Sequence, residues 1–181
     1  MGFFDEVPAP EPEPSRRHHP WLPPEAEFPA RATIDTLLLG RTDQVAVGIT
    51  AISAYSAGFE LFVTARIRPG TPGDPVVARK SLRFGMQLAD GTKVVGPQGR
   101  RGRPDQDAEP TGPILMPFMG GGGPHSIFSR WWAWPLPPSG PLGFVCEWPD
   151  FGIPETRADI DAQLVLDAAG RSIQLWPEDE G

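Results

Sequence analysis

The chain has 181 residues, of which 24 are proline and 21 are glycine, and its formal net charge is −7. This length suits one domain with a sizeable hydrophobic core. The acidic balance argues against binding to nucleic acid or to anionic lipid, and the single cysteine, Cys146, excludes an intramolecular disulfide. The first residues lack the basic and apolar regions of a signal peptide, and no segment is long and apolar enough for a membrane span. We therefore expect a cytoplasmic protein.

Residues 1–30 are rich in proline and charged side chains, which predicts a disordered leader. Two apolar spots interrupt it, Phe3-Phe4 near the start and Trp21-Leu22 further on. One interpretation is that Trp21 and Phe28 pack back onto the domain as a strap. The other is that Phe3-Phe4 is a short docking peptide for a protein partner.

Residues 34–67 carry the first strand signals. A strand is expected over 34–39, and a second over 45–55 with a bulge near Ala51-Ile52, where the alternation of apolar residues slips by one position. The alternation is clearest over 59–67. Such a pattern gives a strand one buried and one solvated face, which is typical of an antiparallel sheet packed on one side.

The next segment adds a hairpin and a shorter strand. Two alternating runs, 82–88 and 92–95, flank Asp90-Gly91, which predicts a hairpin with a type I′ turn. A further strand is expected over 114–118, where Pro117 favours an edge position or a bulge. The glycine run 120–123 is followed by Pro124 and not by a helix, so it favours a flexible or tightly bent loop over a phosphate-binding loop.

The last third predicts a hairpin of strands 127–134 and 142–148, a helix from Thr156 to Ala169, and a final strand over 172–176. Residues 177–181 form an acidic tail. The spacing of strands and turns over 31–176 favours a mainly β fold, an antiparallel β-sandwich of about seven to nine strands with one short C-terminal helix.

Several stretches resemble a family of uncharacterised proteins from high-GC bacteria. They are residues 39–43, residues 113–125, and the segment that runs from Arg130-Trp131-Trp132-Ala133-Trp134-Pro135 to Pro154-Glu155-Thr156-Arg157. The resemblance covers most of the chain beyond the leader and implies one coherent domain. It implies no activity, ligand or catalytic residue.

The cluster of tryptophans near residue 132 is the most unusual feature of the chain. On a strand, Trp132 and Trp134 point to one side and Trp131 to the other, so one indole of the Trp131/Trp132 pair faces away from the core. Either the leader or the helix covers that second face, or Trp131 and Trp132 form an exposed aromatic platform for a partner protein or a sugar ring.

Catalytic signals are weak. The best arrangement the sequence offers is His125 with Asp150 or Glu155, and an isolated histidine is a poor indicator of catalysis. Asp159 and Asp161 are expected as favourable charges in the first turns of the helix. No Cys/His spacing typical of zinc sites occurs, and we expect neither a metal nor a cofactor.

By elimination, the sequence favours a non-catalytic protein-interaction or structural module. The candidate contact residues are Trp131, Trp132, Phe3 and Phe4. The alternatives are a small-ligand or carbohydrate binder that uses the tryptophan-rich face, and a hydrolase built around His125.

Overall fold

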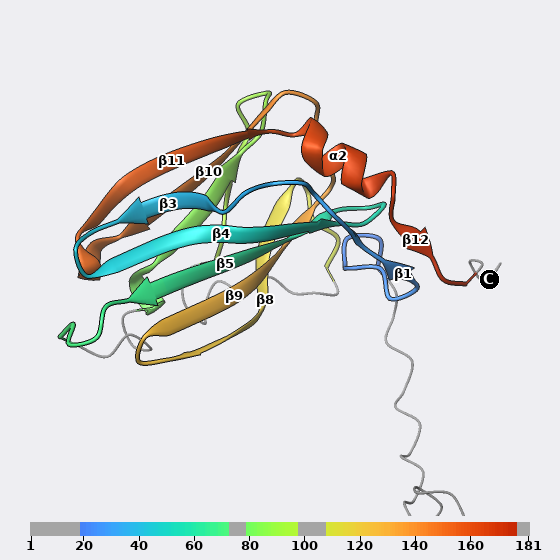
Figure 1. The fold of residues 1–181 in the computed structure, drawn as a ribbon. Helices are drawn as coiled ribbons and strands as arrows, with labels where there is room; N and C mark the ends of the chain where they lie inside the picture. The colour runs from blue at the N-terminus through green and yellow to red at the C-terminus, as the bar shows by residue number, and fades with distance from the viewer. Residues whose placement is uncertain (1–18, 73–78, 98–107, 177–181) are drawn as a thin grey trace, which may run out of the picture.

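The computed structural model describes residues 19–72, 79–97 and 108–176 (Figure 1). The fold is mainly β, with antiparallel sheets and one α-helix, and it is consistent with the predicted sandwich. One sheet has six strands in the order β2-β4-β5-β9-β8, with β3 also paired to β4, and a second sheet has the order β11-β10-β6-β7. A small third sheet pairs β1 with β12.

The bounds of the elements are as follows. The strands are β1 (Glu27–Phe28), β2 (Ala30–Arg31), β3 (Leu37–Arg41), β4 (Val45–Ala54), β5 (Phe59–Ile67), β6 (Arg83–Gln87), β7 (Lys93–Val95), β8 (Ile114–Gly123), β9 (Ser126–Trp134), β10 (Pro141–Trp148), β11 (Ile153–Asp161) and β12 (Ile173–Gln174). The helices are α2 (Gln163–Ala169) and the 3-10 turns η1 (Arg79–Ser81) and η3 (Pro149–Phe151). None of the helices in the described ranges is long and apolar enough to cross a membrane.

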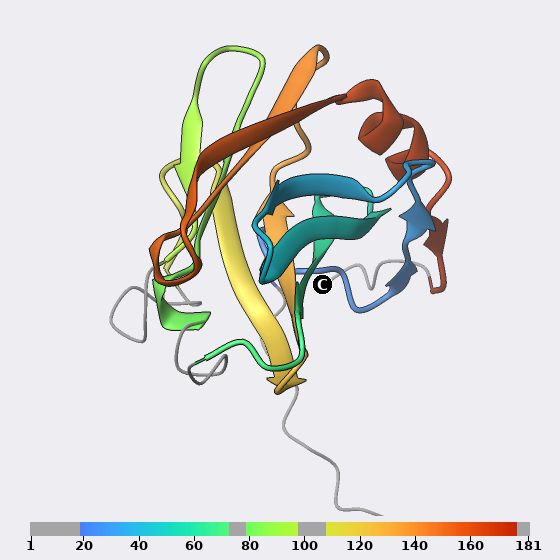
Figure 2. The ribbon, with the colours of Figure 1, turned by 60° about the vertical axis from the view of Figure 1, so that its left-hand side comes forward.

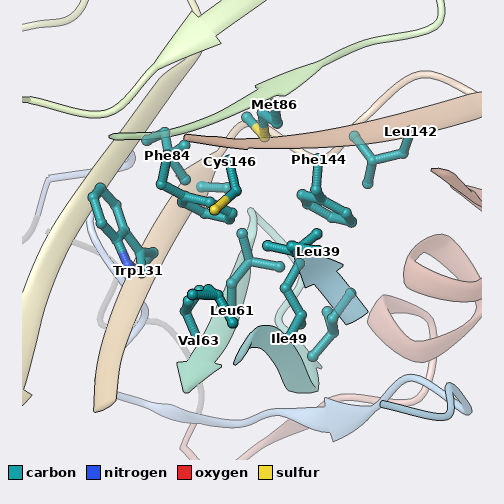
Figure 3. Close-up of a cluster of buried hydrophobic side chains, with 14 of the residues drawn as sticks. Leu39, Ile49, Leu61, Val63, Phe84, Met86, Trp131, Leu142, Phe144 and Cys146 are labelled. Carbon is teal, nitrogen blue, oxygen red and sulfur yellow. The ribbon is translucent and has the colours of Figure 1, made fainter. Parts of the chain in front are cut away.

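The core lies between the two larger sheets, which face each other in Figure 2. Figure 3 shows Phe84, Phe144 and Leu142 from one sheet pointing toward Ile49 and Leu61 from the other. These five side chains are 0–3 % exposed. Because side chains alternate between the two sides of a strand, each sheet contributes every second residue to the core and turns the rest outward.

The register of β4 against β5 shifts between Ile49 and Ala51, so the predicted bulge is confirmed one or two positions earlier than expected. The extra residue changes which positions face the core. Val47 and Ile49 before the bulge, and Ile52 and Ala54 after it, are all buried. The bulge thus keeps apolar side chains on the core side along the whole strand.

The hairpin of β6 and β7 turns at Asp90-Gly91 as predicted, but the turn is not type I′. Gly91 has a positive φ of 89°, and no non-glycine residue in the described ranges has one. The Gly91 N–H donates to the carbonyl of Leu88 (3.0 Å), and the Leu88 N–H donates to Thr92 (2.9 Å). This is the three-residue hairpin loop with glycine in the left-handed position. The Thr92 N–H also donates to Asp90, which lowers the pKa of that carboxyl group.

The glycine run 120–123 does not form a loop, because it is the second half of β8 and pairs with β9. A Cβ on Gly121 would lie 3.1 Å from the ring of Phe128, and one on Gly122 would lie 2.5 Å from the carbonyl oxygen of Ser126. The lack of a side chain at these glycines therefore allows β8 and β9 to approach each other closely. The prediction for Pro117 is confirmed, since β8 is an edge strand and its register shifts between Pro117 and Met119.

The predicted hairpin of residues 127–134 and 142–148 is wrong. β9 belongs to the six-stranded sheet and β10 to the four-stranded sheet, so the proline-rich link between them crosses the sandwich. Each strand has an apolar side, and those sides face each other through the core: Trp131 on β9 lies beside Phe84, which in turn stacks near Phe144 on β10.

The predicted helix from Thr156 to Ala169 is half wrong. Residues 153–161 form β11, and the helix α2 covers only Gln163–Ala169. Exposure along β11 alternates, with Arg157, Asp159 and Asp161 exposed and the residues between them half-buried. Asp159 and Asp161 are therefore on the solvent side of a strand, and pairing with β10 overrides the local helical pattern.

The predicted leader does not extend to residue 30. Residues 27–31 form β1 and β2, which pair with β12 and β4, and residues 19–26 precede them on the surface of the domain. Phe28 does not pack back, because its side chain is 62 % exposed. Residues 1–18, including Phe3 and Phe4, and the tail 177–181 lie outside the described residues.

Candidate functional site

Both tryptophans proposed as a platform are buried. Trp131 is in the core, with its ring 5.2 Å from that of Phe84 and its indole N–H donating to Ser129 (2.9 Å). Trp132 points to the opposite side, as predicted, yet is only 1 % exposed. The platform interpretation is therefore wrong, and the alternative, that the second face of the sheet is covered, is confirmed for the part that carries Trp132.

The cover is the N-terminal strap, which we define as residues 19–28. The indole N–H of Trp132 donates to the carbonyl oxygen of Trp21 (2.7 Å), and Leu22 packs against a cluster of Tyr55, Met116 and Trp132. The Tyr55 ring meets the Trp132 ring edge-on at 5.6 Å. The prediction that Trp21 returns to the domain thus holds through its backbone contact with Trp132.

Two buried carboxylates form hydrogen bonds and an ion pair in and beneath the strap. Glu27 is 5 % exposed, and its two carboxylate oxygens accept from the Ser56 N–H and hydroxyl, each at 2.7 Å. Glu60 is 2 % exposed, forms an ion pair with Arg130, and accepts from the Tyr55 hydroxyl (3.2 Å). A buried carboxylate is stable only with such partners. Burial, together with the nearby charge of Glu60, raises the pKa of Tyr55 to about 12.

Two parts of one surface can now be distinguished on the outer face of the six-stranded sheet, the side turned away from the core. The covered half lies under the strap and consists of Tyr55, Glu60, Met116 and Trp132. The open half continues along the same strands and consists of Phe62, Arg66, Phe118, Met119, Phe128 and Arg130.

The open half combines exposed apolar side chains with arginines. Phe128 and Met119 are 47 % and 52 % exposed and lie on neighbouring strands. Met119 pairs with Arg130 and Phe128 pairs with Gly121, with the Gly120–Ser129 pair between them. The Arg130 guanidinium lies 4.9 Å from the ring centre of Phe118 and 5.0 Å from that of Phe62, in cation–π geometry. Within the described ranges, Nε of Arg130 is the buried side-chain nitrogen that has no hydrogen-bond partner.

The open half contains a second arginine, Arg66, and a third arginine, Arg31, borders it. Arg66 is exposed and donates to the Ser126 hydroxyl (3.0 Å), and the Arg31 guanidinium lies 4.9 Å from the ring centre of Phe62. The carboxylate that contacts this set, Glu60, is buried and already paired with Arg130. This surface can therefore attract carboxylates while it offers rings for stacking.

The hydrolase candidates are not brought together. His125 is exposed in the turn between β8 and β9, where its backbone carbonyl accepts from the Ile67 N–H (3.0 Å). Asp150 in η3 and Glu155 on β11 are exposed beside the other sheet. In the described ranges no hydrogen bond or ion pair joins these side chains, and no cluster of His, Cys, Asp and Glu could hold a metal ion. Burial raises the pKa of Cys146 to about 11, with a further rise from Glu147, so this thiol is a core residue.

Sequence reasoning missed the open half. Phe128 follows the alternation that turns Trp132 outward, and Arg66 occupies the solvated side of the clearest predicted strand, so both signals were present. It also missed an exposed pair on the small sheet, where Phe28 lies opposite Ile173.

Searches against protein-family models, curated proteins and solved structures each gave no match to this chain.

Proposed function

We propose that this protein is a non-catalytic protein-interaction module whose contact surface is the open half of the six-stranded sheet. One observation supports this most directly: exposed Phe128 and Met119 lie among arginines on a protein with a net charge of −7. Phe, Met and Arg are the residue types that protein interfaces favour over ordinary surface, and Lys and Glu are the types that they disfavour.

The chemistry of the surface also indicates the kind of partner. Arg66 and Arg31 favour a segment that carries carboxylates, and the rings of Phe62 and Phe128 favour one that carries an aromatic or large apolar side chain. We therefore infer an acidic segment with an aromatic residue as the ligand. The acidic net charge works against nucleic acid as the ligand and so favours a protein partner. We propose that this interaction takes place in the cytoplasm.

Peptide display with the full-length protein as bait tests this function. Enriched peptides are expected to carry an aromatic residue next to Asp or Glu. They are expected to lose at least tenfold in affinity for the double variant Phe128→Ser/Arg66→Glu.

The matched control is Val95→Ser/Lys93→Glu on β7, which likewise replaces one apolar side chain with Ser and one cation with Glu, at two exposed positions of the other sheet. Enrichment without an acidic-aromatic bias, or equal weakening by both double variants, would refute the proposed surface.

A further inference from the structure

We propose that residues 3–6 of the same chain, Phe3-Phe4-Asp5-Glu6, bind to the open half and compete with the external partner. This inference rests on the proposed function, because it concerns the same surface. It assigns the occupant of that surface when no partner is present.

The composition of the segment matches the surface. Two phenylalanines are followed directly by two carboxylates, and this is the chemistry that the open half favours. Phe3 and Phe4 can stack against Phe128 and Met119, while Asp5 and Glu6 are attracted to Arg66 and Arg31. The remaining acidic residues of the first eighteen, Glu11 and Glu13, reinforce this attraction.

The position of the strap supplies the second argument. The strap reaches the outer face at Trp21, whose carbonyl oxygen bonds Trp132 on β9. Phe128 lies four residues before Trp132 on the same strand, at a distance of about 13 Å. The described chain begins at His19, two residues before Trp21, so the point to which residues 1–18 are attached lies close to this face.

The length of the chain permits the contact. Phe4 precedes His19 by 15 residues, which can span up to about 50 Å when extended. Prolines at positions 8, 10, 12 and 14 favour a polyproline II spacer, and an eight-residue spacer of this kind is about 25 Å long. A tether of this length holds its end at an effective concentration in the millimolar range, so even weak contacts give substantial occupancy.

The consequence is regulation by competition. An external segment must displace residues 3–6, so its apparent affinity falls by the fraction of molecules in which the surface is occupied.

Methionine-methyl NMR on the full chain tests the contact directly. Met119 is exposed on the open half, whereas Met86 is buried in the core and provides an internal control. Changing Phe3→Ser and Phe4→Ser together is expected to shift the Met119 methyl resonance, because nearby ring currents are lost, and to leave Met86 unchanged. An unchanged Met119 resonance would overturn the proposal.

A labelled peptide of residues 1–14 tests the competition. It is expected to bind the Phe3→Ser/Phe4→Ser protein at least tenfold more tightly than wild type, whose surface is occupied in cis. Adding Phe128→Ser/Arg66→Glu is expected to abolish this binding, and adding Val95→Ser/Lys93→Glu is not. Equal binding to wild type and to Phe3→Ser/Phe4→Ser, or binding to neither, would overturn the proposal.

The display experiment distinguishes failure of the cis contact from failure of the proposed function. Display-selected peptides that need Phe128 and Arg66, and that bind wild type and Phe3→Ser/Phe4→Ser equally, would overturn the cis contact and leave the proposed function intact. If the selected peptides bound equally well without Phe128 and Arg66, both the cis contact and the proposed function would be overturned.

Discussion

The covered and open halves of the six-stranded sheet lie on the same strands and differ in what lies over them. Trp132 and Phe128 both point outward from β9, four residues apart, yet Trp132 is 1 % exposed and Phe128 is 47 % exposed. The difference arises from the strap, whose Trp21 is 111 positions away from Trp132 in sequence. An outward aromatic on a strand is therefore structural or available for binding according to a distant segment, and this contrast can be tested by substitution.

The largest expected effect is that of Trp132→Ala. The change empties a site packed by Tyr55 and Met116, and it should lower the free energy of unfolding by about 3–5 kcal/mol. Urea denaturation measures this loss. The control is Trp176→Ala, a tryptophan that is 62 % exposed, for which we expect a change within about 0.5 kcal/mol. Similar losses for the two variants would show that the strap does not bury Trp132.

Arg130→Met should lower the free energy of unfolding by nearly as much, because the buried carboxylate of Glu60 then has no cation beside it. Breaking a buried pair costs about 3–5 kcal/mol, and we expect about 3 kcal/mol here because the Arg130 side chain is partly exposed. Adding Glu60→Leu should recover most of the loss in the same denaturation assay. If the double variant were less stable than Arg130→Met, the carboxylate would not be the source of the cost.

Glu27→Ala should loosen the strap, at a cost of about 2 kcal/mol, because two hydrogen bonds from Ser56 to a carboxylate are lost. Hydrogen exchange should show a faster Ser56 amide while amides in the core strands stay protected. The exposed Glu25, changed to Ala, is the control. Unchanged exchange at Ser56 would mean that the strap is held by other contacts.

The raised pKa of Tyr55 predicts that the protein loses stability at alkaline pH. Its pKa is raised to about 12 in the folded protein, so the unfolded chain loses the proton first, near pH 10. The stabilisation from the neutral hydroxyl is therefore complete below pH 10 and disappears as the pH rises toward 12. Tyr55 is the one tyrosine of the chain, so phenolate absorbance reports it directly.

In Tyr55→Phe, the stability between pH 10 and 12 should fall less than in wild type. A folded-state phenolate transition near pH 10 would contradict the burial of Tyr55 under the strap.

The smallest expected effect is that of Phe128→Ser on stability. The ring is about half exposed and covers Gly121, and we expect a change within about 0.5 kcal/mol in the urea assay. A loss comparable to that of Trp132→Ala would make the open half part of the structure and remove the main argument for a binding surface.

The sequence by itself determined the features that depend on a few neighbouring residues. Alternation over 45–55 and 59–67 predicted β4 and β5, and the slip in that pattern predicted the bulge. Pro117 predicted the interruption of an edge strand, and strand geometry placed Trp131 and Trp132 on opposite sides. These inferences need only the period of a strand and the missing N–H of proline.

Only the tertiary structure decided the features that depend on distant partners. The glycines at 120–123 form a strand because β9 pairs with them, and residues 153–161 form a strand because β10 does. β9 and β10 lie in different sheets although the link between them resembles a hairpin loop. The same applies to the two halves of the outer face, because a local pattern specifies which way a side chain points and carries no information about which distant segment covers it.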